Sequence, residues 1–145
     1  FISSTFWSEK IGYVAALKTL EEMEKIKSWK IITDKGYQIR KKWARLANKY
    51  NLKIEFMGIP AISSFFIKSK NFVKYKTFIT QELLKDSILA SNVIYFSTKH
   101  SQTMIDKYMI SLERVFKIIA ECENGRNIDQ LLETKISQNF FQRLN

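Results

Sequence analysis

The sequence predicts an α+β fold of two layers, in which helices pack mainly on one face of a small three-stranded antiparallel sheet. Apolar residues recur every three or four positions over four long segments, as amphipathic helices require. Between these segments lie three short runs rich in β-branched and aromatic residues. The chain has 145 residues, 46% of them hydrophobic, which is the size of one domain with a core of its own.

Two helices are expected first, over residues 8–27 and 28–50. The earlier helix follows the stretch SSTFW, and Ser8 stands where its N-cap is expected. Ser28 is expected to cap the later helix, and Asn51 to end it, because Asn is frequent just beyond helix ends.

After Asn51 the apolar period changes from that of a helix to that of a strand. Gly58-Ile59-Pro60 marks a turn between two runs of this kind. A third run follows the next helical segment, and Ser101 opens the last long helix. The expected elements are strands over residues 52–58, 62–68 and 92–98, and helices over residues 71–86 and 101–123.

The chain is expected to divide into three parts. Residues 1–27 form an interdomain segment and linking helix, and residues 28–124 form a small compact domain. Gly125 and Asn127 break the last long helix, so residues 125–145 form a tail with a short docked helix. The abrupt apolar start without a Met indicates a piece of a longer protein, and the helix over residues 8–27 is expected to be poorly covered.

The chain is basic, with 24 Lys and Arg against 14 Asp and Glu and a formal net charge of +10. Ten of these cations lie between residues 25 and 53, at helical spacing among apolar residues. One interpretation is the solvated face of an amphipathic helix, and the other is a free-standing basic binding module for nucleic acid or an acidic partner. The first is favoured, and nucleic acid disfavoured, because no recognition motif accompanies the charge.

The sequence lacks the residues that a membrane helix, a metal site or a catalytic motif would require. The apolar runs are far shorter than the roughly 20 residues of a membrane helix, which favours a cytoplasmic protein without a membrane partner. One Cys, Cys122, and one His cannot supply a usual zinc site, so no metal is expected. No glycine-rich phosphate loop or nucleophile with its base is present, so no catalytic residue is assigned. His100 is expected to fix the backbone before the last helix, with general-base chemistry as the less favoured role.

The stretch SSTFWSEKIGYVAALKTLEEME resembles the segment of class III pyridoxal-phosphate (PLP) aminotransferases that crosses from the large domain to the small domain. Further stretches, EFMGIPAISSFF, TFITQELLKDSILASN and VIYFSTKHSQTMIDKYMISLERVFKII, are similar to successive parts of the C-terminal domain of the glutamate-1-semialdehyde 2,1-aminomutase group. The resemblance covers about residues 1–120. It implies the C-terminal small domain of a fold-type I PLP enzyme.

The resemblance also implies a cofactor contact. Thr5 matches the family's Thr, whose hydroxyl reaches the PLP phosphate of the other subunit of a homodimer, and Ser4 stands where Gly is usual. Ser87 likewise occupies a position where Gly is frequent, and Glu9-Lys10 replaces a common Asn-Pro. Thr5 and Ser4 are therefore the expected cofactor-binding residues.

The family's Schiff-base Lys and the Asp that pairs with the pyridine nitrogen both precede this segment, in the large domain. The chain is therefore expected to be inactive alone and to work with its own large domain, a second subunit and a small-molecule amino substrate. Whether the parent moves the amino group between molecules or within one is not decided by these residues.

Overall fold

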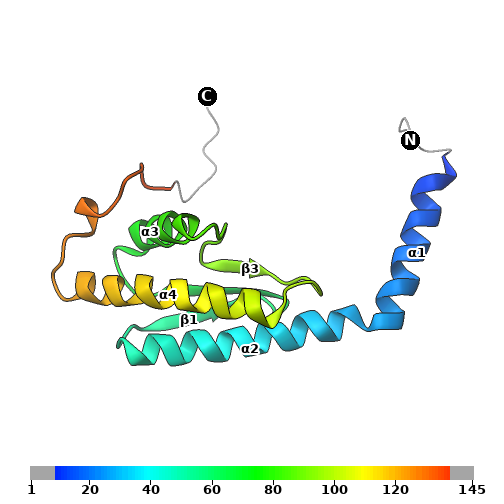
Figure 1. Cartoon of the computed structure of the whole chain (residues 1–145), viewed down its shortest axis with the longest axis horizontal. Coiled ribbons are helices and arrows are strands. Elements are labelled where there is room, and N and C mark those ends of the chain that lie inside the picture. Colours follow the sequence, from blue (N-terminus) through cyan, green and yellow to red (C-terminus); the bar gives the residue numbers. More distant parts are fainter. Residues whose placement is uncertain (1–8, 138–145) are drawn as a thin grey trace.

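The computed structural model describes residues 9–137, and it confirms the predicted α+β fold class (Figure 1). Its strands form one antiparallel sheet in the order β1-β2-β3. The elements in chain order are α1 (Lys10–Ile26), α2 (Ser28–Lys49), β1 (Ile54–Met57), β2 (Ile62–Ile67), α3 (Phe72–Lys85), β3 (Val93–Tyr95), α4 (Gln102–Glu123) and the 3-10 helix η1 (Ile128–Gln130).

The core lies between the sheet and the helices α2, α3 and α4. Alternate residues of β2 point into it, and Phe65 at the middle of the strand is 1% exposed. Phe65 meets Trp43 of α2 edge-on, with ring centroids 4.8 Å apart, and Phe116 of α4 at 5.6 Å. These three rings fix the layer spacing, because large rings at the centre of a core bury much of its apolar area.

The turn between β1 and β2 is fastened to α2 by Arg40. Its guanidinium donates to the carbonyls of Met57 and Gly58 at 3.1 and 2.7 Å, and to the Ser63 hydroxyl at 3.0 Å. Gly58 has φ = 75°, a conformation that glycine adopts without steric cost. The predicted turn at Gly58-Ile59-Pro60 is therefore present and is held by side-chain contacts as well.

The junction of α1 and α2 differs from the prediction. Ser28 does not cap α2 but lies inside its first turn, where it is buried. A single residue, Lys27, joins the two helices in the left-handed conformation, with φ = 50°. Its amide hydrogen-bonds to the carbonyls of Glu24 and Met23, which ends α1. No loop separates the helices, so no position is left for a side-chain cap.

Other helix ends agree with the sequence. Asn51 adopts φ = 54° just after α2, as expected for a residue that ends a helix. The Ser101 hydroxyl accepts a hydrogen bond from the Met104 amide at 3.2 Å and caps α4. The Ser8 cap lies outside the described residues, and Glu9 is the N-cap of α1 without a side-chain cap bond.

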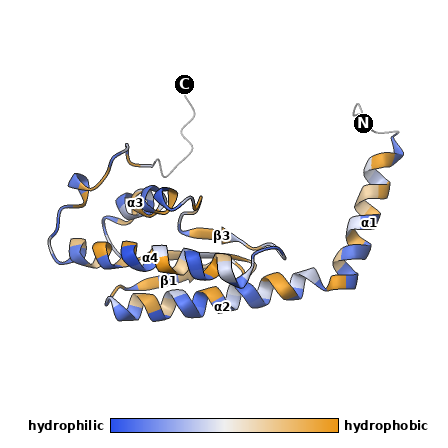
Figure 2. Cartoon of the chain, in the orientation of Figure 1, coloured by the Kyte–Doolittle hydropathy of each residue, from blue (hydrophilic) through white to orange (hydrophobic). Residues whose placement is uncertain are grey.

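Helix α1 is uncovered, as predicted. None of its residues is buried, and its large apolar side chains are exposed, among them Ile11 at 76% and Leu17 at 64%. Figure 1 shows α1 standing away from the sheet and the other helices, and Figure 2 shows its hydrophobic positions without a neighbouring element. Within residues 9–137, burial therefore adds no stability to α1.

The described part of the tail contains the single 3-10 turn η1 and no longer helix. Ile128 in this turn is 4% exposed and belongs to the core. Gln81 of α3 then holds the extended chain that follows. Its amide nitrogen donates to the Leu131 carbonyl at 2.9 Å, and its oxygen accepts from the Glu133 amide at 2.8 Å. Backbone bonds to Gln81 thus replace the expected short α-helix up to residue 137.

Candidate functional site

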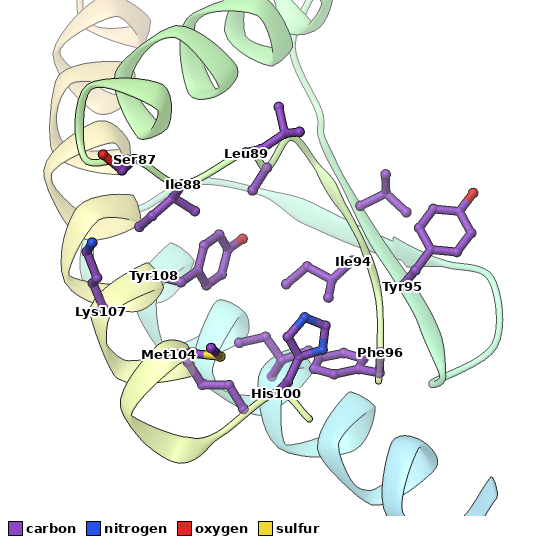
Figure 3. Close-up of a pocket in the computed structure, with 14 residues that line it drawn as sticks. Ser87, Ile88, Leu89, Ile94, Tyr95, Phe96, His100, Met104, Lys107 and Tyr108 are labelled. Carbon is purple, nitrogen blue, oxygen red and sulfur yellow. The ribbon is translucent and has the colours of Figure 1, made fainter. Parts of the chain in front are cut away.

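The residues that the sequence marks as cofactor-binding, Ser4 and Thr5, lie outside the described residues. Within them, the clearest candidate site is an apolar groove of about 600 Å³ beside β3 (Figure 3). We call it the β3 groove. Its wall is built by β3, by the loop before β3, by the N-terminal half of α4 and by one residue of α2. Residues that line it include Ile39, Ile88, Leu89, Ile94, Met104 and Tyr108.

One end of the groove is shaped by His100, which confirms the backbone role predicted for it. Its Nδ1 accepts a hydrogen bond from the Ser97 amide at 2.9 Å, and its ring stands edge-on to Phe96 at 5.7 Å. With Nδ1 used as an acceptor, the neutral imidazole carries its proton on Nε2. His100 thus closes the turn between β3 and α4 and adds one donor beside the groove.

The same turn is fastened to α2 by Lys35. Its ammonium donates to the carbonyls of Ser97, Thr98 and His100, at 3.5, 2.9 and 2.5 Å. These are charge-assisted bonds, and they replace the solvent contacts of the ammonium. Lys35 therefore acts as a clamp between two segments more than 60 residues apart. Sequence analysis missed it, because only the tertiary fold brings those carbonyls to the helix.

Deeper in the groove lies the hydroxyl of Tyr108, a residue that is 6% exposed. The hydroxyl accepts a hydrogen bond from Trp43 Nε1 at 3.0 Å. Burial raises the pKa of Tyr108, so the phenol stays protonated at neutral pH. No acceptor for its own proton is described between residues 9 and 137. Figure 3 shows Tyr108, Ile94 and His100 directed toward the same space.

The groove has the chemistry of a binding surface and lacks that of a hydrolytic centre. Its lining is mostly aliphatic and aromatic, with Lys107, His100 and Tyr108 as hydrogen-bond donors and no carboxylate among the described lining residues. Cys122, the one thiol, is buried near the end of α4, where burial raises its pKa, so it behaves as the small helix residue that was predicted.

About half of the cations in the basic segment make contacts within the described part of the chain. Lys42 pairs with Asp106 at 2.8 Å and Lys49 with Glu113 at 2.5 Å, which ties α2 to α4. Lys35 and Arg40 bind backbone carbonyls, as described above. These contacts weaken the nucleic-acid interpretation, because a cation that is already paired offers less to a phosphate.

Residues 9–137 contain no group of three or more His, Cys, Asp or Glu side chains able to hold a metal ion. None of the described helices combines the length and the apolar character that crossing a bilayer requires.

Comparison with known proteins identifies a solved structure of similar fold. No protein-family model matches the chain, and no curated protein sequence does. Among solved structures, the chain is similar to the PLP internal aldimine form of the FumI protein from Sphingopyxis sp. MTA144, with a TM-score of 0.74 and 13% sequence identity. The match covers 90% of this chain and 32% of that one. The chain therefore has the fold of one third of a PLP-containing protein.

Proposed function

We propose that the chain is the C-terminal portion of a PLP-dependent class III aminotransferase or aminomutase of the glutamate-1-semialdehyde aminomutase kind. The structural similarity to a PLP-containing protein over 90% of the chain supports this most strongly. The family resemblance of the sequence is a second support, because it rests on the residues and not on the fold. In this proposal the parent is a cytoplasmic homodimer that acts on a small amino substrate.

The proposed role of this portion is to close the active site. The exposed apolar side of α1 supports a docking role, because an uncovered apolar helix face of this length is costly unless another surface covers it. The large domain of the parent is the proposed cover. Closure of one domain on another excludes water from the reacting groups.

The second proposed role is one contact to the cofactor of the neighbouring subunit. PLP, when bound, supplies the electron sink for the amino-group chemistry. This chain would supply the Thr5 hydroxyl and the backbone at Ser4 to its phosphate. Glu9 at the N-cap of α1 supports a hydroxyl contact, since a carboxylate there opposes anion binding by the helix end.

The described lysines give no support for a covalent cofactor link within this chain. Lys35, which is half-buried, has its ammonium held by three carbonyls. We therefore assign this portion no chemical step, and we propose that it is inactive alone.

One observation separates this proposal from a free-standing module. The coding sequence immediately upstream of Phe1 should continue in the same frame into a PLP-binding domain that contains the Schiff-base Lys. Expressed together, the two parts should bind PLP in one dimer. An in-frame stop codon shortly before Phe1 would refute the proposal.

A further inference from the structure

The outer edge of β3 is free. The sheet order β1-β2-β3 gives β3 one neighbouring strand only. The Phe96 amide donates to the Ala61 carbonyl of the β2 side at 2.9 Å. Because hydrogen-bonded and non-bonded pairs alternate along an antiparallel ladder, Val93 and Tyr95 turn their N–H and C=O groups away from β2. Those backbone groups have no hydrogen-bond partner within residues 9–137.

The opposite edge of the sheet, at β1, is protected in a way that β3 is not. β1 carries Glu55, which is paired with Lys68 at 2.5 Å, and Lys53 precedes the strand. Charged side chains on an edge strand discourage further pairing. β3 has the sequence Val-Ile-Tyr, with neither charge nor proline, and Tyr95 is 69% exposed. Of the two edge strands, β3 is the one without a charged side chain.

The β3 groove runs beside this free edge. It is lined by every residue of β3 and continues to Met104 and Ile105 on α4, so it can receive apolar side chains from a strand added at the edge. Leu89, at one end of the groove, is 86% exposed and adds apolar surface there. Backbone groups and an apolar groove are the two components by which a sheet edge recognises an extended peptide.

One cation and the hydrogen-bond donors near the groove indicate which kind of segment can bind there. Lys107 and His100 line it, and Tyr108 adds a hydroxyl donor, whereas no described lining residue is acidic. A second copy of this chain is a poor fit, because each copy has a formal net charge of +10 and would bring the same cations to the interface. A segment with acidic groups beside its apolar residues complements the site.

We propose that the β3 edge and the β3 groove bind an extended segment of a partner polypeptide, which adds to the sheet as a fourth strand. Apolar side chains at alternate positions of the segment fill the groove, and acidic residues at one end meet Lys107 and the donors nearby. This docking surface does not depend on the proposed enzymatic parent, since it rests on the edge and the groove alone.

The test uses the 145-residue chain and a defined probe. The probe is an acetylated nine-residue peptide of alternating valine and threonine that ends in two glutamates. The amides of Val93 and Tyr95 are followed by nuclear magnetic resonance, together with their hydrogen exchange. Saturating peptide should slow exchange at both amides by about tenfold or more, while the Ile94 amide, already bonded to β2, should change little. Lysines in place of the glutamates should weaken binding.

Two variants of Tyr95 distinguish the contribution of its backbone N–H to peptide binding from that of its side chain. Tyr95→Pro removes the outward N–H without removing a bond to β2, as a proline on an edge strand can. Tyr95→Ala removes the same ring and keeps the N–H. Tyr95→Pro should weaken peptide binding by about tenfold relative to Tyr95→Ala, the loss expected for one hydrogen bond. The amide spectrum of β1 and β2 shows whether each variant keeps its sheet.

Each remaining outcome contradicts the proposal. Equal binding by the two Tyr95 variants would show that the edge is not used. Shifts confined to another surface, or no binding by the wild-type chain at millimolar peptide, would exclude this docking surface. Protection of Val93 and Tyr95 that rises with protein concentration in the absence of peptide would show that a second copy occupies the edge instead.

Discussion

Gly36 of α2 lies directly against the carbonyl of Pro60, at the turn between β1 and β2. A Cβ atom on Gly36 would stand 1.8 Å from the Pro60 oxygen and 2.3 Å from its carbonyl carbon. Contacts that short do not occur, so this position accepts only a residue without a side chain. Because Gly36 has no Cβ atom, α2 and the turn can pack in direct contact.

Gly36→Ala should lower the free energy of unfolding by roughly 2–4 kcal/mol, because the backbone of the turn must move away from α2. Urea unfolding followed by Trp fluorescence measures the change. The matched control is Gly12→Ala in α1, where nothing lies within 4 Å of the added Cβ. That control should raise helix content and leave the unfolding midpoint of the core in place. Equal midpoints for the two variants would contradict the packing described here.

Ser87→Gly should stabilise the chain by about 0.5–1 kcal/mol. Ser87 has φ = 59°, a conformation that is unfavourable for serine and accessible to glycine. Asn51→Gly is the control, since Asn51 has φ = 54° and asparagine tolerates that conformation better. A larger gain at position 51 than at position 87 would argue against this explanation.

The ionisation of Tyr75 should make the fold sensitive to alkali. Burial, and then a hydrogen bond of 2.5 Å to Glu123, raise the pKa of Tyr75 from 10.0 to about 12. The neutral phenol is thus favoured in the folded state, so its contribution to stability is complete below pH 10 and is lost as the pH rises from 10 toward 12. Unfolding curves across this window should show a steeper loss for wild type than for Tyr75→Phe. Parallel losses would mean that Tyr75 titrates normally.

Thr5→Val in the full-length dimer tests the proposed phosphate contact. A hydrogen bond to a charged acceptor contributes about 1.5–3 kcal/mol, so the variant should lose PLP roughly 10 to 150 times faster. Ser3→Ala is the control and should change the dissociation rate much less. An unchanged PLP dissociation rate for Thr5→Val, with the dimer intact, would contradict the proposed contact between Thr5 and the phosphate.

The isolated chain should form no specific covalent complex with PLP. Borohydride reduction of a mixture, followed by peptide mass spectrometry, should find scattered low-level labelling and no stoichiometric adduct at one lysine. Absorbance near roughly 410–430 nm should accordingly stay weak. A single fully modified lysine would contradict the proposal that the parent's large domain carries the Schiff-base residue.

Much of the fold could be predicted because local signals and tertiary structure agree. The change of apolar period at Asn51 located the two-strand hairpin, and Ser101 and Asn51 mark helix ends as their chemistry predicts. The same logic failed at Ser28, where two helices are joined by one left-handed residue and burial competes with capping.

The candidate site was harder to predict, because its parts are distant in sequence. His100 could be placed in its backbone role from its position between a strand and a helix. Lys35 had no such signal, since its partners lie more than 60 residues away. The β3 edge also could not be anticipated, because a run of apolar residues does not reveal which of its neighbours pairs with it.

The isolation of α1 has a thermodynamic consequence. A helix of 17 residues without a buried side chain has only the marginal stability of a free peptide, so its helix–coil equilibrium is separate from the cooperative melting of the core. Far-ultraviolet circular dichroism should therefore decline gradually before near-ultraviolet signals change, and the chain should not behave as a two-state system. Any surface that binds α1 must also supply the free energy that orders it, which lowers the affinity and makes assembly strongly temperature-dependent.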